Sequence, residues 1–399
     1  MSLLVDPPAW PAHGRLWSHL VSDESLPELH AFASGLGVPR QAFDRDHYDV
    51  PAEAYAAVVA AGAEPVDSRE LVARLVRAGL RQRRVRTTGR RKLGQVLVRP
   101  PRLRAGAVVA VVSPAGPVSP DRLHRGLAVL RGWGLQLRPG PYVLGRHPTL
   151  EHLAGSDVER AADLEAAWTD PEVAAVWCAR GGSGSHRLVD LLDHTAMADA
   201  PPRLLVGFSD VTALHELVNG RLGLVSVHGP VVTSLGAAPP AAAERVRRLL
   251  FEPAEAVDLF AGVPLRTLCA GSADGVLVGG NLRVLTAALG TRTSRSARGG
   301  IVVIEDVGEE SYRIDAMLTQ LRRSGWFDGV RGVVAGSFDA VPEQHLDAVL
   351  RDRLGDLGVP VVTGAPFGHV ADNRPVPLGV RARLDAKAGT LRLSQPALA

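Results

Sequence analysis

The chain of 399 residues contains few lysines and few cysteines. Lys92 and Lys387 are the only lysines among its 45 basic residues, so arginine carries nearly all of the positive charge. Two cysteines, Cys178 and Cys269, are too few for a dense disulfide framework or for a thiolate metal site. Because their neighbours are apolar, we interpret them as ordinary buried thiols of a reducing compartment, without a redox role.

Long apolar runs are also missing. The N-terminus has no basic region and meets Asp6 and two prolines before an apolar run can develop, which argues against a signal peptide. The longest stretch without formal charge, 222–243, is interrupted by His228, prolines and glycines, so it is not expected to span a bilayer. With 46% hydrophobic and 22% charged residues, the chain can form two or three packed domains. We therefore expect a cytoplasmic, globular protein without a membrane partner.

The net charge of +3 hides an uneven distribution of basic residues. Residues 81–104 hold ten of them and no acid, while acidic residues outnumber basic ones in the rest of the chain. With its prolines and glycines, this segment is predicted to be an exposed linker. An electrostatic tether for RNA or another polyanion is the alternative. No aromatic residue stands between the arginines to stack on bases, which favours the linker and argues against nucleic acid as a partner.

The sequence of residues 1–80 predicts a small N-terminal domain, α/β or mostly helical, with helices over 25–36, 52–61 and 68–78, and we favour the α/β class. The domain is rich in histidine and aspartate, the residues that Zn²⁺ or Mn²⁺ would recruit for a metal or phosphoester site. Their spacings match no ligand motif, and nearby aromatic residues are typical of ordinary packing. We assign no metal from the sequence and leave both interpretations open for His13, His19, His30, His47, Asp6, Asp46 and Asp49.

From residue 105 to 240 short apolar runs alternate with helical segments, a pattern typical of a Rossmann-like parallel sheet. Residues 234–273 connect this domain to a second one over 270–395, which is predicted to be a smaller, β-rich α+β unit with a partly closed sheet. The predicted strands of the two domains cover 108–112, 135–138, 174–179, 204–206, 275–278, 301–304, 332–335, 361–363 and 391–393. The predicted helices cover 119–133, 158–168, 185–192, 210–218, 241–250, 281–289, 311–324 and 343–354.

The stretch Gly207-Phe208-Ser209-Asp210 places a serine at the sharp turn between a buried strand and a helix. Such a turn exposes the hydroxyl and directs the N–H groups of the helix start toward the same space. The motif differs from a lipase-type elbow because Val211 replaces its second glycine, and a helix cap formed by Ser209 or Asp210 would be the structural alternative.

Two later residues favour a nucleophilic serine. Glu305 directly follows a continuous apolar strand, and His369 lies in a loop rich in glycine and proline. A serine hydroxyl needs a base to take its proton, and an imidazole base needs an acid to fix its tautomer. We therefore predict that Ser209, His369 and Glu305 form a catalytic triad.

These motifs resemble the LD-carboxypeptidase family, cytoplasmic serine peptidases of the muramoyltetrapeptide carboxypeptidase type. The resemblance covers about 106–395 and rests on motifs at 113–114, 179–184, 207–212, 228–230, 279–282, 305–309, 312–315 and 368–369. It implies that Ser209 is the nucleophile, His369 the base and Glu305 the acid that orients it. It further implies release of terminal D-Ala from murein tetrapeptides by a homodimer that needs no metal or other cofactor. Residues 1–80 resemble a small bacterial domain of unknown function, which supplies no activity.

Neighbouring residues have predicted roles in this reaction. The backbone N–H groups of Asp210 and Gly182 are expected to hold the oxyanion, and Gly181 to line the substrate site. Arg180 is predicted either to bind the substrate's free carboxylate or to form a salt bridge behind its loop. Asn281 either caps a helix or contacts substrate.

The sequence offers three alternatives to this function. A metallopeptidase is not supported, because His215-Glu216 has no second histidine to complete His-Glu-x-x-His. A self-immunity peptidase that cleaves peptide-nucleotide antibiotics is the alternative within the same fold. A protein that binds polyanions or partners through residues 1–104 is the alternative from another class.

Overall fold

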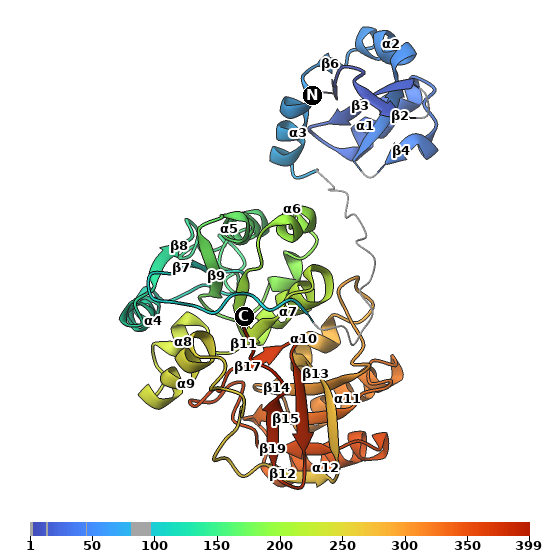
Figure 1. The fold of residues 1–399 in the computed structure, drawn as a ribbon. Helices are drawn as coiled ribbons and strands as arrows, with labels where there is room; N and C mark the ends of the chain where they lie inside the picture. Colours follow the sequence, from blue (N-terminus) through green and yellow to red (C-terminus); the bar gives the residue numbers. More distant parts are fainter. Residues whose placement is uncertain (1–2, 13–14, 45, 81–96) are drawn as a thin grey trace. The chain divides into compact units, whose positions relative to one another are not determined.

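A computed structural model describes residues 3–12, 15–44, 46–80 and 97–399 (Figure 1). Its contacts divide the chain into two compact units, with the division at residue 84. We call the described residues up to 80 the N-terminal unit and residues 97–399 the C-terminal unit, and we describe each by itself. Within the described ranges, no helix is long and apolar enough to cross a membrane. Most of the proposed polyanion tether, residues 81–96, lies outside the described residues.

The N-terminal unit has α/β structure, as predicted. Its three predicted helices are confirmed as α1 (Leu26–Gly35), α2 (Tyr55–Ala60) and α3 (Ser68–Arg77), and Ser25 caps α1 by accepting a hydrogen bond from the Glu28 N–H. The sequence analysis did not identify the strands, which form a sheet in the order β4-β5-β3-β1-β6 with β2 paired to β3. They are β1 (Leu3–Val5), β2 (Trp10–Ala12), β3 (Arg15–Ser22), β4 (Phe43–Asp44), β5 (His47–Pro51) and β6 (Glu64–Pro65).

Both faces of this small sheet are covered. Successive strand side chains point to opposite faces, so Val5 and Leu20 pack with helix α1 whereas Leu4 and Val21 pack with helix α3. All four side chains are fully buried. The unit therefore has an apolar core on each side of its sheet.

The end of the predicted linker belongs to the C-terminal unit, which corrects part of that prediction. Leu97 and Leu103 are buried, and Leu103 N–H donates to the Leu250 carbonyl. Arg99 and Arg102 donate side-chain hydrogen bonds to the carbonyls of Pro396 and Phe251. Residues 97–104 are therefore tied to this unit by Leu97, Leu103 and these hydrogen bonds, although Val98, Arg102 and Arg104 remain exposed.

The first sheet of the C-terminal unit has the order β17-β11-β10-β9-β7-β8 and is parallel except for β17. The four predicted strands are confirmed as β7 (Val108–Val112), β8 (Gln136–Pro139), β9 (Val173–Cys178) and β10 (Leu204–Gly207). Two strands that were not predicted, β11 (Ser226–His228) and β17 (Val376–Leu378), complete the sheet. Side chains on one face pack with α5 (Asp157–Thr169), α6 (His194–Asp199) and α7 (Thr212–Leu217). The other face packs with α4 (Pro120–Gly132), α8 (Val232–Leu235) and α9 (Pro240–Phe251), giving a doubly wound domain.

The helix predicted over 185–192 is wrong. Only a single 3₁₀ turn, Ser185–Arg187, forms there, after Gly184 with a φ of 117°. The helix α6 begins later, because the Asp193 side chain accepts hydrogen bonds from the N–H groups of Thr195 and Ala196. The capping aspartate therefore sets the start of this helix.

The second sheet has the order β12-β16-β15-β14-β13-β18-β19. Its strands are β12 (Arg266–Cys269), β13 (Ser272–Asn281), β14 (Gly300–Asp306), β15 (Gly332–Phe338), β16 (Val361–Thr363), β18 (Arg381–Asp385) and β19 (Thr390–Leu393), with the central four parallel and the outer pairs antiparallel. One face packs with the predicted helices, observed as α10 (Leu282–Ala287), α11 (Ser311–Arg323) and α12 (Glu343–Leu354). This β-rich half confirms the predicted fold class.

The two halves share one apolar core. Val303 and Val334 of the second sheet belong to the same buried cluster as Val111 and Trp177 of the first. The late strand β17 also pairs with β11, so the second half of the chain completes the edge of the first sheet. This shared packing holds the ends of β10 and β14 in one framework.

Candidate active site

Ser209 stands at the turn after β10 in a backbone conformation that is rare for serine. Its φ is 64°, and among the described residues it is the only residue other than glycine with a positive φ. Gly207 permits the close packing of this turn, since a Cβ there would lie 2.9 Å from Val211 Cγ1 and 3.1 Å from Cys178 Cβ. A strained serine at a tight strand-to-helix turn is typical of an exposed nucleophile.

Buried polar contacts hold this turn in place. The Asp210 Oδ2 atom accepts a hydrogen bond of 2.7 Å from the Ser185 N–H, which fixes the glycine-rich loop 180–185 to the turn. On helix α7, His215 Nε2 donates to the Gly207 carbonyl at 2.8 Å. Burial lowers the pKa of His215 to about 3, so this imidazole is neutral and its Nδ1 accepts a hydrogen bond from Ser226 Oγ.

The predicted acid and base lie together although 64 positions separate them in the chain. Glu305, fully buried near the end of β14, accepts a hydrogen bond of 2.7 Å from His369 Nδ1. Burial alone would raise the pKa of Glu305, but the adjacent His228 and His369 lower it to about 2. The carboxylate is therefore ionised, and it raises the pKa of His369 above its ordinary value although burial opposes this.

The loop around His369 fixes the orientation of the imidazole. The His369 N–H donates to Ser337 Oγ at 2.9 Å. Gly368 has a φ of 99°, and a Cβ there would lie 2.5 Å from Glu305 Oε2, so only glycine allows the carboxylate to approach. With Nδ1 bound to Glu305, the neutral ring carries its lone pair on Nε2.

The base also lies against the turn that carries the predicted nucleophile. The rings of Phe208 and His369 have centroids 4.8 Å apart, and Phe208 directly precedes Ser209. Among the described residues, no hydrogen bond joins Ser209 Oγ to the imidazole. Such catalytic hydrogen bonds are often long without substrate and shorten in the Michaelis complex.

The glycine-rich loop lies directly beside the serine. A Cβ at Gly181 would lie 3.0 Å from Ser209 Cβ and 3.3 Å from its Oγ. Gly182 has a φ of 119° and packs on Gly116, whose N–H donates to the Gly181 carbonyl. Within the described part of the chain, neither the Gly182 N–H nor the Asp210 N–H donates to a protein acceptor. These two N–H groups therefore remain without a protein acceptor among the described residues, and their role as oxyanion donors stays a prediction.

Arg180 and Asn281, the two residues left with alternative roles, differ in their surroundings. Arg180 is exposed and donates to the Pro117 carbonyl at 2.8 Å, and no carboxylate pairs with it among the described residues. Asn281 is only 4% exposed, and its Oδ1 accepts from the Val284 N–H and caps α10. Its amide donates to Glu305 and Asp306, so the contacts support the capping role rather than substrate contact.

Comparison with known sequences assigns the family. The model of the LD-carboxypeptidase N-terminal domain matches residues 109–229, and that of the LD-carboxypeptidase C-terminal domain matches residues 274–384. The chain belongs to the LD-carboxypeptidase family. It is a serine-type carboxypeptidase, as the motifs indicated. Residues 3–78 match a separate domain model described only as a protein of unknown function, DUF4031.

Relatives of this LD-carboxypeptidase extend over most of the C-terminal unit. A Streptomyces coelicolor protein named as a carboxypeptidase, SCO6489, is 54% identical over 307 residues, which cover 76% of this chain and 98% of that protein. The murein tetrapeptide carboxypeptidase of Pseudomonas aeruginosa is 35% identical over 288 residues, covering 69% of this chain and 92% of the relative.

The fold is shared with the microcin C7 self-immunity protein MccF. The Escherichia coli MccF sequence is 25% identical over 307 residues, covering 68% of this chain and 88% of MccF. A solved structure of MccF in complex with glutamyl sulfamoyl guanosine matches with a TM-score of 0.68 and 21% identity, covering 76% of this chain and all of that one. This structural likeness establishes the fold.

The sequence analysis of this LD-carboxypeptidase missed Arg160 and did not predict the contact of His228 with Glu305. Arg160 is 1% exposed on α5 and donates to the carbonyls of Pro114, Gly155 and Gly184, which ties the loop after β7 to the glycine-rich loop. His228, fully buried, places its Nε2 atom 3.6 Å from Glu305 Oε1, a separation at which its effect is electrostatic. The His-Gly-Pro motif marked His228, but no sequence signal identified Arg160.

Proposed function

We propose that this enzyme releases the terminal D-Ala from murein tetrapeptides during cell-wall recycling, with Ser209, His369 and Glu305 as its catalytic triad. The observation that carries the proposal is the 2.7 Å contact between a buried carboxylate and the His369 imidazole, which packs against the turn of a strained serine. The name of the 35% identical relative supports the choice of substrate.

The acylation step follows from the orientation of the imidazole. His369 Nε2 takes the proton of Ser209 Oγ as this oxygen attacks the carbonyl carbon of the bond that precedes D-Ala. The negative charge that develops on the carbonyl oxygen is stabilised by the N–H groups of Asp210 and Gly182. The ionised Glu305 stabilises the imidazolium that forms at His369.

The second half of the reaction restores the enzyme. The imidazolium gives its proton to the amine of D-Ala as the carbon–nitrogen bond breaks, and the shortened peptide remains esterified to Ser209. His369 then takes a proton from water, whose oxygen attacks the ester carbonyl. The tripeptide leaves as a carboxylic acid, and the proton returns to Ser209 Oγ.

We propose that Arg180 binds the free carboxylate of the terminal D-Ala. Its guanidinium is exposed beside the glycine-rich loop and has no acidic partner among the described residues, so it is available to a ligand. A hydrogen bond to a charged group contributes about 1.5–3 kcal/mol, so Arg180→Ala should raise KM roughly 10- to 150-fold and change kcat less. Steady-state kinetics with the tetrapeptide measure this.

A substrate control separates carboxylate binding from a structural effect of Arg180→Ala. Amidation of the terminal carboxylate should weaken binding to the native enzyme but make little difference to the variant. Arg131→Ala, on the exposed side of α4, should leave KM unchanged. An unaltered KM for Arg180→Ala with the free tetrapeptide would refute this role.

The substrate itself is tested with murein peptides of three, four and five residues, incubated with the full chain in EDTA. Mass spectrometry should detect loss of a single D-Ala from the tetrapeptide alone. Removal of D-Ala from the pentapeptide instead would show cleavage between two D-centres and refute the LD specificity. Activity that requires an added metal would refute the serine mechanism.

The likeness to MccF supports a second candidate function, that of a self-immunity peptidase. Members of one fold with the same triad can differ in substrate, because substrate choice depends on the surrounding loops rather than on the serine, histidine and acid. A parallel assay with glutamyl sulfamoyl guanosine, the compound in the MccF structure, distinguishes the two functions. A higher kcat/KM for this compound than for the tetrapeptide would favour the self-immunity function.

We further propose, from the family resemblance, that the enzyme acts in the cytoplasm as a homodimer.

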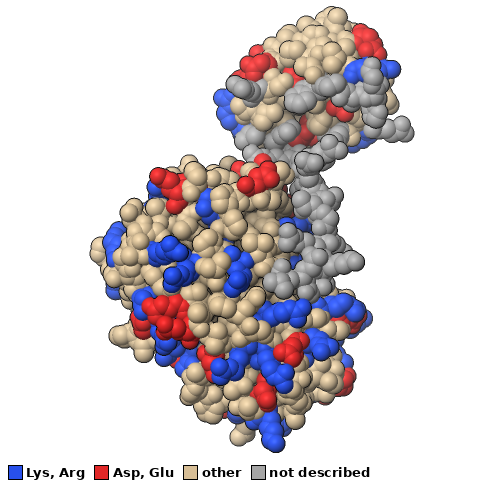
Figure 2. All heavy atoms as spheres, viewed as in Figure 1, with Lys and Arg blue, Asp and Glu red and all other residues tan. Residues whose placement is uncertain are grey.

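Figure 2 shows basic and acidic side chains interspersed over the visible face of the C-terminal unit, which offers no support there for a polyanion as partner.

A further inference from the structure

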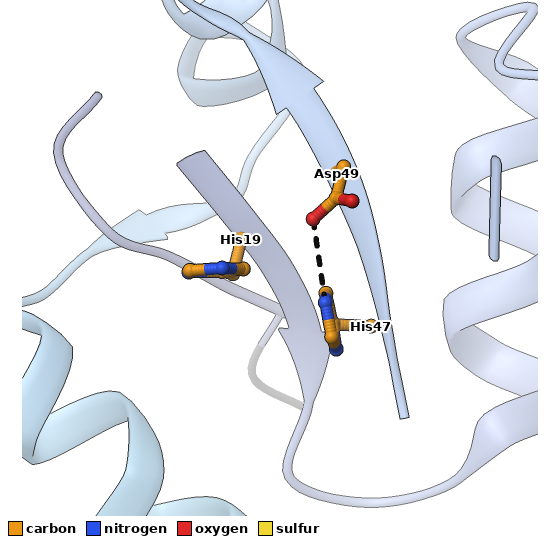
Figure 3. Close-up of side chains that lie close together, drawn as sticks. All are labelled: His19, His47 and Asp49. Atoms are coloured by element: carbon orange, nitrogen blue, oxygen red, sulfur yellow. Dashed lines mark ion pairs between the residues drawn. The ribbon is translucent and has the colours of Figure 1, made fainter. Parts of the chain in front are cut away.

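The N-terminal unit, to which no activity is assigned, gathers side chains that can bind a metal. His19 on β3 pairs directly with Asp49 on the antiparallel strand β5, and His47 lies two positions before Asp49 on the same face. One nitrogen or oxygen atom from each of the three residues lies within 4.8 Å of the others. Figure 3 shows His47 and Asp49 directed toward each other, with His19 on the neighbouring strand.

Each of the two imidazoles is oriented by its own buried carboxylate. His19 Nδ1 lies 3.0 Å from Asp6 Oδ2, and His47 Nδ1 lies 2.7 Å from Asp46 Oδ1. Both aspartates are only 1% exposed. A carboxylate on Nδ1 keeps a proton on that atom, so the ring binds a metal through Nε2 once Nε2 has lost its proton, and such carboxylate–histidine pairs surround many metal sites.

The orienting carboxylate of His19 is itself fixed. Asp6 accepts hydrogen bonds from Ser68 Oγ at 2.7 Å and from the His19 N–H at 2.6 Å. The three elements β1, β3 and α3 therefore meet around one aspartate whose oxygens face a histidine. Ordinary packing of the sheet does not require this arrangement, because the apolar core lies among other residues.

The dimensions and the exposure of the cluster suit a small cation. His47 Nε2 and Asp49 Oδ1 are 3.3 Å apart, close to the separation of roughly 3.3 Å that two ligands adopt on a tetrahedral metal with bonds of about 2.0–2.1 Å. The side chains of His19, His47 and Asp49 are 27%, 14% and 47% exposed, so an ion can enter from solvent. Three protein ligands leave a further coordination position for water or a substrate atom.

We propose that His19, His47 and Asp49 form a binding site for one divalent transition-metal ion, with Zn²⁺ as the best match to two imidazoles and one carboxylate. Mg²⁺ and Ca²⁺ prefer ligand sets made of oxygen alone, so a site with two ring nitrogens selects against them. All three residues of the site belong to the N-terminal unit, so the site would give the domain of unknown function a specific ligand.

The test uses the full chain, stripped of metal with a chelator and then dialysed. Titration with Zn²⁺ followed by calorimetry, with metal content measured by mass spectrometry, should show one equivalent bound per chain. His19→Gln and His47→Gln should abolish this equivalent. Asp46→Asn, which changes only an orienting carboxylate, should weaken binding by about 10- to 100-fold.

Two further variants control for unfolding and for surface binding. His30 belongs to the same unit but lies outside the cluster, where it contacts the Tyr48 hydroxyl. The variant His30→Gln should therefore still bind one equivalent of Zn²⁺. Asp49→Asn changes the most exposed ligand, so it should lose affinity while the thermal unfolding of the metal-free chain is unchanged. The proposal is overturned if the native chain binds no Zn²⁺, or if the His19, His47 and Asp49 variants bind it as tightly as native protein.

Discussion

Ser209→Ala is expected to lower kcat for D-Ala release by about four to six orders of magnitude, with little change in KM. The substitution removes Ser209 Oγ, the atom that forms a covalent bond to the substrate in the proposed reaction. Gly182, Asp210 and Arg180 remain to bind the peptide. Single-turnover assays with the tetrapeptide should detect no acyl-enzyme by mass spectrometry. The residual rate of the variant should be about the rate that an oxyanion site and substrate binding sustain without a nucleophile.

The strained backbone at position 209 supplies a matched comparison. Alanine keeps the Cβ that makes a φ of 64° unfavourable, whereas glycine removes it. Ser209→Gly should therefore be as inactive as Ser209→Ala but more stable than it by about 1 kcal/mol in thermal unfolding. Ser394→Ala, at an exposed position, controls for loss of a serine hydroxyl. Undiminished turnover of Ser209→Ala would end the assignment of the nucleophile.

Much of the site's framework was predictable because buried parallel strands have a clear sequence pattern. The continuous apolar runs at 204–206 and 301–304 correctly located β10 and β14, and therefore the turns that follow them. Parallel strands carry their functional loops at their carboxyl ends, so Ser209 and Glu305 could be selected as site residues. His369 was selected from its loop rich in glycine and proline and from the need of a serine for a base, and the family motifs agreed with this role; no strand pattern would have identified it.

The remaining features depend on contacts that a sequence pattern does not encode. Four strands of the N-terminal unit, β1, β2, β4 and β6, have only two or three residues, and β2, β5 and β6 contain proline, so the strand pattern of this unit is weak. Arg160 is an ordinary arginine on an amphipathic helix until three loop carbonyls are seen around its guanidinium. The pairing of His19 with Asp49 likewise requires the register of β3 and β5.

Glu305→Gln is expected to reduce kcat by about 10⁴-fold at neutral pH, although glutamine has nearly the same shape as glutamate. The carboxylate accepts a hydrogen bond from His369 Nδ1, which leaves the Nε2 lone pair for Ser209. A glutamine can instead present its N–H₂ group to Nδ1, which favours the tautomer with the proton on Nε2. That tautomer cannot accept the serine proton. The kcat for tetrapeptide cleavage measures the loss, with Glu310→Gln, exposed and close in sequence, as the control.

The pH profile distinguishes this effect from a general disturbance of the fold. Catalysis needs neutral His369, and Glu305 raises the pKa of this imidazole, so native kcat should fall as pH decreases through that raised pKa. Glu305 itself, with a pKa of about 2, stays ionised over the range in which the enzyme is folded and assayed. Without the carboxylate the imidazolium is less stable, so the acid limb of Glu305→Gln should move to lower pH even as the maximum rate falls. If both the limb and the rate stay at their native values, Glu305 does not orient the base, and the proton on Nδ1 must be held by another group.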